Sequence, residues 1–467
     1  MSHQNPLMEF VHRRRRGAEL FLLVLALVVG IGGYAAVGVG VEGKVPPDIV
    51  AYGGWLAALI LAAHIVVRLT APYADPVLLP VVAALNGLGL AVIHRLDLAK
   101  GLDQPASFAR QQLTWMTLGV ILFAGTLVLL RDHRLLQRFT YTSGLVAILL
   151  LLLPMLPLVG KDINGARIWI HIGSMSFQPG EVAKVLLVIA FAGYLVLHRD
   201  ALALAGRRVL FVDLPRGRDL GPILAMWLVS LGILVFQHDL GSSLLFFGLF
   251  LVMLYVATER PGWLVVGGGM FAVGALAAYK LLGHVTDRVD IWLHPFDYYQ
   301  QTSGPHSDQL VESMFGMAWG GLTGRGFGNG SPYRISYAES DFIMGAIGEE
   351  LGLTAVMAVI VCYGLIVERG LRTALICRDG FGKLVATGLA CSFALQVFVV
   401  VGGVTRLIPL TGLTTPFLSY GGSSLVANWV IIALLLRISD QARRPIPDLS
   451  SPDDDMEHTQ VVKLMPS

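Results

Sequence analysis

The chain has 467 residues, of which 55% are hydrophobic and only 14% are charged, and its mean hydropathy is +0.68. Soluble domains carry roughly 25% charged residues, so this composition excludes an ordinary water-soluble protein. The formal net charge is only +2, and the basic residues lie mostly in short loops between apolar segments. These features predict an all-α polytopic membrane protein and do not indicate nucleic-acid binding.

Apolar segments recur along most of the chain, and a helix needs about 20 such residues to cross a bilayer. Glycine and proline inside these segments do not exclude helices, because neighbouring helices satisfy the freed backbone groups. We therefore expect twelve membrane helices. They are predicted at 19–41, 49–69, 76–94, 111–130, 141–159, 182–197, 219–236, 240–258, 262–283, 341–366, 384–408 and 422–437.

Arginine and lysine predict the orientation of these helices, because short cytoplasmic loops are enriched in both residues. The four arginines at 13–16 place the N-terminus in the cytoplasm. With twelve spans, the basic clusters at 131–138, 199–218 and 369–383 also fall in cytoplasmic loops. Both termini are therefore predicted to be cytoplasmic, with 438–467 as a polar, disordered tail.

The first long outer segment, 160–181, contains the sequence GARIWIHIGSMSFQPGE. It is amphipathic and is expected to lie in the lipid headgroup layer. Arg167 is placed to meet an anionic headgroup, although an ordinary interfacial anchor would carry the same residue. Glu181 and Lys184 are spaced i and i+3 on the first turn of a helix, so they are predicted to form an ion pair. Such a pair either fixes helix packing or lines a cavity, and both roles are compatible.

Two further aspartates precede predicted membrane helices. Asp239, in QHDLGSS, either caps its helix with Ser242 nearby or faces a water-filled cavity, because a carboxylate in the membrane needs a partner. Asp341 is followed by Phe342 and is expected to cap the helix that it opens.

The longest outer segment, 284–340, is too rich in aromatic residues and glycine for a solvated linker. The part from Gln309 to Trp319 is predicted to lie on the membrane as a half-buried helix. The glycines between 320 and 330 suit a backbone that packs closely against ligand or protein. No strand precedes them, so a nucleotide-binding loop is not supported. The carboxylates of the segment are Asp287, Asp290, Asp297, Asp308, Glu312 and Glu339.

Four sequence blocks resemble the SEDS family (shape, elongation, division and sporulation), which contains RodA, FtsW and SpoVE. The blocks are GARIWI with FQPGEVAK, then QHDLGSS, then SDFIMGAIGEELG, then IPLTGLTTPFLSYGGSS at 408–424. They occur in the family's order and spacing, and the last is the most specific. The sequence of the last block and the short terminal tails resemble those of elongation-type members more than those of division-type members.

The resemblance implies a ten-helix core at 76–437, preceded by two additional membrane helices within 19–75 and a basic N-terminus at 1–18. Members of the family are lipid II-dependent peptidoglycan glycosyltransferases of the bacterial cytoplasmic membrane. They work with a class B penicillin-binding protein, a transpeptidase with one membrane helix. By resemblance, the partners of this chain are therefore lipid II, such a transpeptidase and membrane lipids.

The family's essential aspartate lies in the long outer loop, and by similarity Asp297 in WLHPFDYYQ takes its place. In the family pattern the aspartate follows the proline by three residues, whereas Asp297 follows Pro295 by two. Asp290 and Asp308 are therefore also candidates. The resemblance also implies substrate-binding roles for a set of outer residues, which are Arg167, Glu181, Lys184, Asp239, Asp341, Ser419 and Ser423.

The family's reaction joins the 4-hydroxyl of an acceptor GlcNAc to C1 of a donor MurNAc and releases polyprenyl pyrophosphate. Pyrophosphate leaves without protonation when its charge is neutralised, so one carboxylate base and nearby cations suffice. Asp297 is the expected base, with Arg167, Lys184 or a divalent cation (Mg²⁺ or Mn²⁺) as the neutralising charge.

Three different functions compete with this interpretation. A lipid flippase is the main one, although no internal repeat relates the two halves of the chain. A division-type polymerase and a non-catalytic membrane scaffold for cell-wall enzymes are the second and third.

Overall fold

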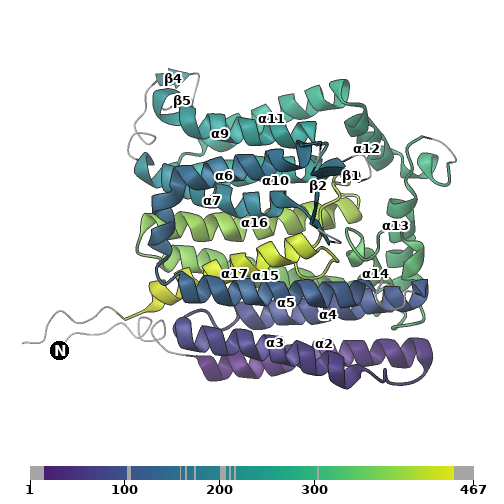
Figure 1. Cartoon of the computed structure of the whole chain (residues 1–467). Helices are drawn as coiled ribbons and strands as arrows, with labels where there is room; N and C mark the ends of the chain where they lie inside the picture. The colour runs from purple at the N-terminus through teal and green to yellow at the C-terminus, as the bar shows by residue number, and fades with distance from the viewer. Residues whose placement is uncertain are drawn as a thin grey trace, which may run out of the picture.

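A computed structural model describes residues 15–101, 107–157, 159–163, 166–172, 175–199, 207–209, 212–214, 217–301 and 304–445. These residues form a bundle of long helices that run side by side (Figure 1). Eleven helical spans in the described chain are long and apolar enough to cross a membrane, and the apolar stretch 221–236 of α9 is a shorter helix at the position of the remaining expected span. The prediction of a helical, multi-pass membrane protein is therefore confirmed.

The helices of the bundle match the predicted spans closely, except for the span predicted at 341–366. The 3-10 helices η1 (His133–Phe139) and η2 (Leu153–Met155) extend α6 at its two ends. The bundle helices are α2 Arg16–Glu42, α3 Ile49–Thr70, α4 Leu78–Lys100, α5 Phe108–Leu129, α6 Thr140–Leu152, α7 Pro179–Leu197, α9 Gly217–Phe236, α10 Leu240–Thr258, α11 Gly262–Leu281, α15 Gly352–Ile376, α16 Gly380–Val404 and α17 Gly422–Arg443.

Shorter elements gather at one end of the bundle, at the right of Figure 1. We call this end the outer end, after the predicted orientation, and the opposite end the inner end. The outer elements are β1 Gly160–Ile163, β2 Ala166–Ile172, β3 Met175–Phe177, α12 Gly283–Leu293, η3 Pro295–Tyr298, α13 Asp308–Gly320, η4 Pro332–Arg334 and α14 Ile343–Glu350. The inner end carries the two-stranded sheet of β4 (Arg207–Val209) and β5 (Val212–Leu214).

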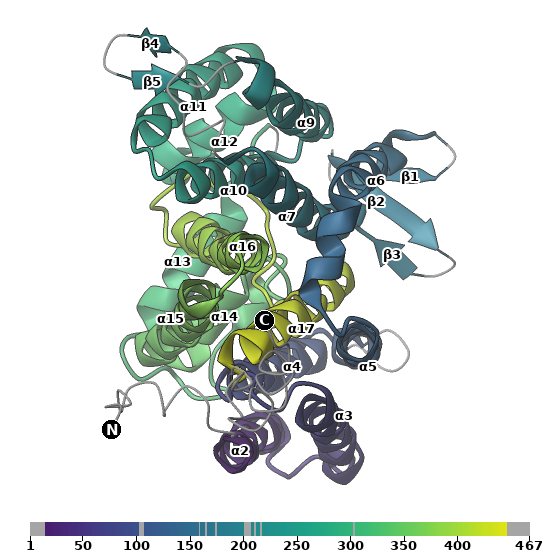
Figure 2. The ribbon, with the colours of Figure 1, turned by 90° about the vertical axis from the view of Figure 1, so that its left-hand side faces the viewer.

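The interior of the bundle is built around α17, which lies between α4, α7 and α16 in the view along the helices (Figure 2). Trp429 of α17 is completely buried and meets the rings of Phe123 and Phe417 edge-on, with centroid distances of 5.4 and 6.0 Å. Peripheral helices instead expose large apolar side chains, such as Phe21 of α2 and Val265 of α11. In a bilayer these side chains face hydrocarbon, which is the reverse of a soluble protein's surface.

The two N-terminal helices, α2 and α3, are joined to the rest of the chain at both ends. At the inner end, the buried Arg16 guanidinium pairs with Glu19 and donates hydrogen bonds to the carbonyls of residues 71, 72 and 74. Glu19 also contacts His64 Nδ1 of α3 at 2.9 Å. At the outer end, Gly40 of α2 lies against the backbone of residues 327 and 328, where an added Cβ would collide with the carbonyl of Phe327.

This close approach predicts that Gly40→Ala destabilises the protein by about 1–3 kcal/mol, because the backbone of the outer loop has to move. Gly32→Ala in the same helix is the control, since no neighbouring atom lies within 4 Å of a Cβ there, and alanine favours helix. The measurement is the unfolding temperature of each purified variant in detergent. Equal unfolding temperatures for the two variants would contradict the proposed contact.

The predicted single helix over 341–366 is wrong, because the chain breaks between α14 and α15. Gly352 has a φ of 78°, in the left-handed region that favours glycine. The glycine-rich loop satisfies the backbone groups at this break: the N–H groups of residues 325 and 326 donate to the last carbonyls of α14, at 3.1 and 2.8 Å. The first N–H groups of α15 donate to the carbonyls of residues 321 and 322. These glycines therefore pack against protein, which is one of the two predicted possibilities.

The remaining outer predictions differ in how well they match the structure. The predicted half-buried helix from Gln309 to Trp319 is present as α13, with Trp319 exposed. The amphipathic segment 160–181 forms an antiparallel sheet in the order β1-β2-β3, with Ile170 paired to residues 160 and 177. Its apolar and polar side chains alternate with the period of a strand, and this sheet was not predicted from the sequence.

The predicted tails lie mostly beyond the described part of the chain. α17 continues to Arg443, beyond the predicted helix end at residue 437. Residues 446–467 of the predicted disordered tail, and residues 1–14 of the basic N-terminus, are outside the described residues.

Candidate outer active site

Charged side chains from four separate segments gather at the outer end of the bundle. The first two are Glu181 and Lys184 on the opening turn of α7, which begins at Pro179, a residue suited to the first helical position. Lys184 Nζ donates to Glu181 Oε2 at 2.8 Å, and both side chains are buried. The predicted ion pair is therefore present. Lys184 also donates to Gln396 Oε1 of α16 at 2.9 Å, so the pair joins two helices.

Asp239 caps the N-terminus of α10, which is one of the two roles predicted for it. Its Oδ1 accepts a hydrogen bond from the Ser242 N–H at 2.9 Å. Burial raises the pKa of Asp239, and the neighbouring Glu181 carboxylate raises it further, whereas Ser242 and Arg288 oppose the rise. The fold therefore brings Asp239 close to Glu181, 58 positions earlier in the sequence. Capping and a place in a charged cluster occur together here.

Arg288 is a member of this cluster that was not predicted from the sequence. It lies on α12, and its Nη1 donates to the carbonyl of Leu410 at 3.0 Å. Burial lowers the pKa of Arg288, whereas the carboxylates of Asp239 and Asp341 raise it. The Arg288 guanidinium therefore lies near enough to two acids from different loops for each to stabilise its charge. A signal was available, because Arg288 is the only arginine or lysine between residues 281 and 324.

Asp341 does not cap a helix, so this prediction is wrong. The residue before α14 is Phe342, and no side chain caps this helix. The Asp341 Oδ1 instead accepts a hydrogen bond from Ser340 Oγ at 2.7 Å. Burial raises the pKa of Asp341, and Arg288 partly opposes the rise. Asp341 therefore belongs with the outer charged cluster, which we define as Glu181, Lys184, Asp239, Arg288 and Asp341.

Ser419 and Ser423 are buried beside this cluster, where their hydroxyls hold loops together. Ser419 Oγ accepts from the Thr415 N–H at 2.9 Å and donates to the carbonyl of Ser340. Ser423 Oγ accepts from the Gln178 N–H at 2.8 Å. The block 408–424 is thereby tied to the residue before Asp341 and to the start of α7. Direct substrate contact by either serine stays a prediction.

Helix α4 adds two ion pairs that sequence reasoning did not find. Arg95 Nε lies 2.7 Å from Glu350 Oε1, and both side chains are buried. Lys100 Nζ lies 2.8 Å from Glu339 Oε2. These pairs fix the segment from η4 to α14 against the bundle. The partners are more than 200 positions apart in sequence, so no local spacing could indicate them.

Asp297 and Arg167 occupy more exposed positions than the cluster. Asp297 lies in η3, its side chain is exposed, and its carboxylate accepts no hydrogen bond from the described residues. Arg167 lies on β2 with an exposed side chain, and its N–H donates to the carbonyl of Gln237 at 3.3 Å. Of the two further candidates for the base, Asp308 already accepts the Gln300 N–H at 2.8 Å, and Asp290 is half-buried on α12. The assignment of the base stays a prediction.

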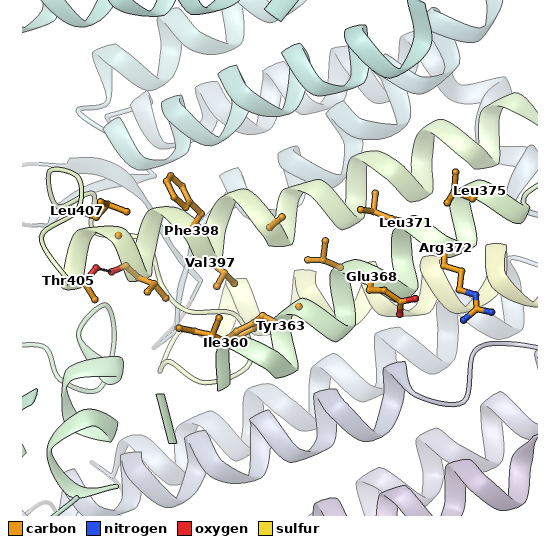
Figure 3. A pocket seen from close by; sticks show the side chains of 15 residues that line it. Ile360, Tyr363, Glu368, Leu371, Arg372, Leu375, Val397, Phe398, Thr405 and Leu407 are labelled. Atoms are coloured by element: carbon orange, nitrogen blue, oxygen red, sulfur yellow. Dashed lines mark hydrogen bonds between the residues drawn. The ribbon is translucent and has the colours of Figure 1, made fainter. Parts of the chain in front are cut away.

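A separate groove of about 740 Å³ runs between α15 and α16 (Figure 3). Its walls are mostly apolar, with Tyr363 and Phe398 among them, and Glu368 and Arg372 lie towards its inner part. It contains no residue of the outer charged cluster. Such a lining suits hydrocarbon rather than sugar or pyrophosphate, so this groove is not the candidate active site.

Comparison with known proteins places these residues in a family. The family model described as "Cell cycle protein", which covers FtsW, RodA and SpoVE, matches residues 76–444. The peptidoglycan glycosyltransferase RodA of Mycobacterium tuberculosis is 48% identical over 435 residues, covering 92% of each chain. RodA of Mycobacterium leprae is 46% identical over 434 residues, again covering 92% of each chain. A match over 92% of this chain necessarily includes part of the α2–α3 pair.

More distant relatives agree with this assignment. A probable peptidoglycan glycosyltransferase FtsW of Trichlorobacter lovleyi is 31% identical, covering 78% of this chain and 93% of the relative. The solved Thermus thermophilus rod shape determining protein RodA covers 78% of this chain and 96% of its own, with 27% identity and a TM-score of 0.56. A chain of a peptidoglycan synthase complex superposes with a TM-score of 0.63 at 28% identity, covering 79% of this chain and 98% of its own.

The family match spans all four sequence blocks and every member of the outer charged cluster, and the solved relatives share the helical arrangement. The resemblance inferred from the sequence is confirmed: the chain belongs to the FtsW/RodA/SpoVE family of cell cycle proteins.

Proposed function

We propose that this chain is a peptidoglycan glycosyltransferase that polymerises lipid II into glycan strands during cell-wall elongation and the maintenance of cell shape. The observation that carries this proposal is the 48% identity to RodA over 92% of both chains. The bundle adds physical support, because a polyprenyl-linked substrate keeps its tail in the bilayer and presents its sugars at the headgroup level. The outer charged cluster lies at that end of the helices.

The proposed reaction needs one proton acceptor and a site for a leaving anion. Asp297 takes the proton of the acceptor 4-hydroxyl, whose oxygen then bonds to C1 of the donor sugar. The bond from C1 to the pyrophosphate oxygen breaks with inversion, and its electron pair stays on pyrophosphate. Lys184 and Arg288 of the cluster, together with Arg167 on β2, supply the positive charge for this anion. Preorganised cations stabilise such developing charge strongly when water is excluded.

A divalent cation, Mg²⁺ or Mn²⁺, is a second possible source of this positive charge. Asp297, exposed and free of hydrogen bonds to the described residues, is the residue best placed to share a metal with the substrate pyrophosphate. Adding a chelator to the polymerisation assay separates the two cases. Full activity without divalent metal assigns the role to the side-chain cations.

The setting follows from the same family resemblance. We propose that the protein lies in the bacterial cytoplasmic membrane with both termini in the cytoplasm and the cluster facing outward. Its proposed partner is a class B penicillin-binding protein, in line with its likeness to a chain of a peptidoglycan synthase complex. A division-type role and a flippase activity are the competing functions.

The experiment that tests the proposal is glycan polymerisation from purified lipid II, with the cognate transpeptidase present and absent. Glycan polymer formed in either condition supports the proposed glycosyltransferase activity. Transbilayer movement of labelled lipid II in vesicles without any polymer favours the flippase. The division-type role is tested separately by depletion in cells, where filaments indicate division and rounded cells indicate elongation.

Arg288→Ala is expected to lower the polymerisation rate by about 10²-fold, the size of a lost charge-stabilising donor. The variant also leaves Asp239 and Asp341 without the cation they share. Arg288→Lys keeps the positive charge but lacks the planar set of N–H donors of a guanidinium, so partial activity is expected. Arg325→Ala is the control, because Arg325 stacks on Trp319 at 3.8 Å outside the cluster. Equal rates for Arg288→Ala and Arg325→Ala would remove Arg288 from the site.

A further inference from the structure

Three side chains that commonly bind transition metals lie together at the inner end, opposite the outer charged cluster. They are His133 in η1, after α5, and Cys377 and Asp379 between α15 and α16. His133 Nε2 lies 2.9 Å from Asp379 Oδ2, and Cys377 Sγ lies 3.3 Å from the same oxygen. All three possible ligand atoms fall within 4.8 Å of one another. We call these residues the inner donor cluster.

The hydrogen bonds around His133 fix which of its nitrogens carries hydrogen. Gln441 of α17 donates from Nε2 to the carbonyl of Arg131 at 2.8 Å, which fixes the orientation of its amide. The Gln441 Oε1 therefore faces His133 Nδ1 and has to accept a hydrogen bond from it. In a neutral imidazole the other nitrogen, Nε2, then has only a lone pair. This lone pair meets the Asp379 carboxylate, so two acceptors face each other.

Two acceptors 2.9 Å apart need a proton or a metal ion between them. A second proton on His133 would meet this need, and Cys377 would then only donate its thiol hydrogen to the same Asp379 oxygen. A metal ion uses all three. Imidazole, thiolate and carboxylate are the ligands of zinc sites. A ligating histidine ordinarily donates its other ring N–H to an oxygen, as His133 does to Gln441.

The surrounding backbone also leaves space for this convergence. Asp379 Oδ1 caps α16 by accepting the Gly382 N–H at 2.7 Å, so its second oxygen, Oδ2, is the one turned to His133 and Cys377. A Cβ at Gly382 would collide with His133 Nε2 and would lie 2.7 Å from the Cys377 Sγ and 3.0 Å from Asp379 Oδ2. Only glycine therefore leaves room among the three donors. The nearest further cation is Arg134, whose Nε lies 3.6 Å from Asp379 Oδ2 on an exposed side chain.

We propose that His133, Cys377 and Asp379 bind one Zn²⁺ ion at the inner end, with water in the fourth position. Binding releases the thiol proton of Cys377 to solvent, since the thiolate is the ligand. The ion fastens the α5–α6 connection to the α15–α16 connection, and Gln441 extends the link to α17. Its role is structural, because the proposed chemistry takes place at the other end of the bundle.

Metal content of the purified full-length protein tests this proposal directly. After saturation with zinc and removal of excess metal, we expect about one zinc per chain in the wild type. Cys377→Ser is expected to lose this zinc, whereas Cys391→Ser, which changes a cysteine inside α16, keeps it. The protein loaded with cobalt in place of zinc should show a thiolate-to-metal charge-transfer absorption band. This band should be absent in Cys377→Ser and present in Cys391→Ser. Gln441→Leu is expected to weaken zinc binding by about 10–100-fold.

A second measurement avoids any variant of the cluster itself. Replacing Cys362 and Cys391 by serine leaves Cys377 as the only thiol, since the chain has three cysteines. We expect a zinc chelator to speed maleimide labelling of Cys377 by about tenfold or more, because a metal-bound thiolate is shielded. A wild type that holds no zinc after saturation, together with a labelling rate unchanged by chelator, overturns the proposal and leaves a protonated His133 paired with Asp379.

Discussion

We expect Asp297→Ala to abolish measurable glycan polymerisation from lipid II while the protein keeps its wild-type unfolding temperature. The loss of a general base typically costs about 10²–10⁴-fold in rate. Stability is expected to stay unchanged because the Asp297 side chain is exposed and bonds to no described residue. Asp297→Asn should be nearly as inactive, since the amide has the shape of the carboxylate but cannot take up the proton.

The matched control is Asp287→Ala, which removes an exposed carboxylate from the neighbouring helix α12. It should polymerise at close to the wild-type rate. Wild-type activity in Asp297→Ala would move the base to Asp290 or Asp308. Asp308 is the weaker of these two candidates on structural grounds, because its carboxylate already accepts the Gln300 N–H. A variant that is inactive but also less stable would leave the assignment open to Asp290.

The second large effect is expected at the buried pair in α7. Lys184→Met keeps most of the side-chain volume but leaves the Glu181 carboxylate buried without its cation, close to Asp239. Breaking one partner of a buried ion pair costs about 3–5 kcal/mol. We therefore expect a large fall in the unfolding temperature of purified Lys184→Met, together with loss of polymerisation. The double variant Glu181→Gln/Lys184→Met should recover much of the stability but not the activity.

The control is the exposed pair of Arg199 and Glu259, whose charged atoms lie 3.2 Å apart. Exposed pairs contribute about 0–1 kcal/mol, so Arg199→Ala should change the unfolding temperature little. If Lys184→Met is as stable as Arg199→Ala, Glu181 is not desolvated as the structure indicates. In that case Glu181 would have access to water, and the cluster would be an open cavity rather than a packed contact.

The sequence predicted those features that depend on neighbouring residues. The long helices followed from runs of apolar residues, and the Glu181–Lys184 pair followed from the i, i+3 geometry of one helical turn. α13 followed from its amphipathic composition. The sheet of β1–β3 was missed although its residues alternate, because the segment was interpreted by its overall amphipathicity and not by its period of two.

The features that were missed depend on partners far away in the chain. The end of α14 could not be located from the sequence, because the backbone N–H groups that bond to its last carbonyls belong to residues 325 and 326. Arg288 belongs to the cluster because it lies near Asp239 and Asp341, which are on other elements. The capping rule failed for Asp341 because α14 begins one residue later than expected, with Phe342 at the capping position, while the Asp341 carboxylate accepts from Ser340 Oγ. Long-range contacts of this kind leave no local pattern in a single sequence.

The contact between Gly40 and the outer loop has a consequence for the order of assembly in the membrane. During synthesis α2 is inserted first, and the inner partners of Arg16 follow at residues 71–74. The outer partner of α2, at residues 327 and 328, is made almost 290 positions after Gly40. Chains generally fold from the N-terminus as they emerge, yet here the first helix completes its contacts late. A nascent chain arrested before residue 320 therefore still lacks the outer contact of α2, which only the longer chain can make.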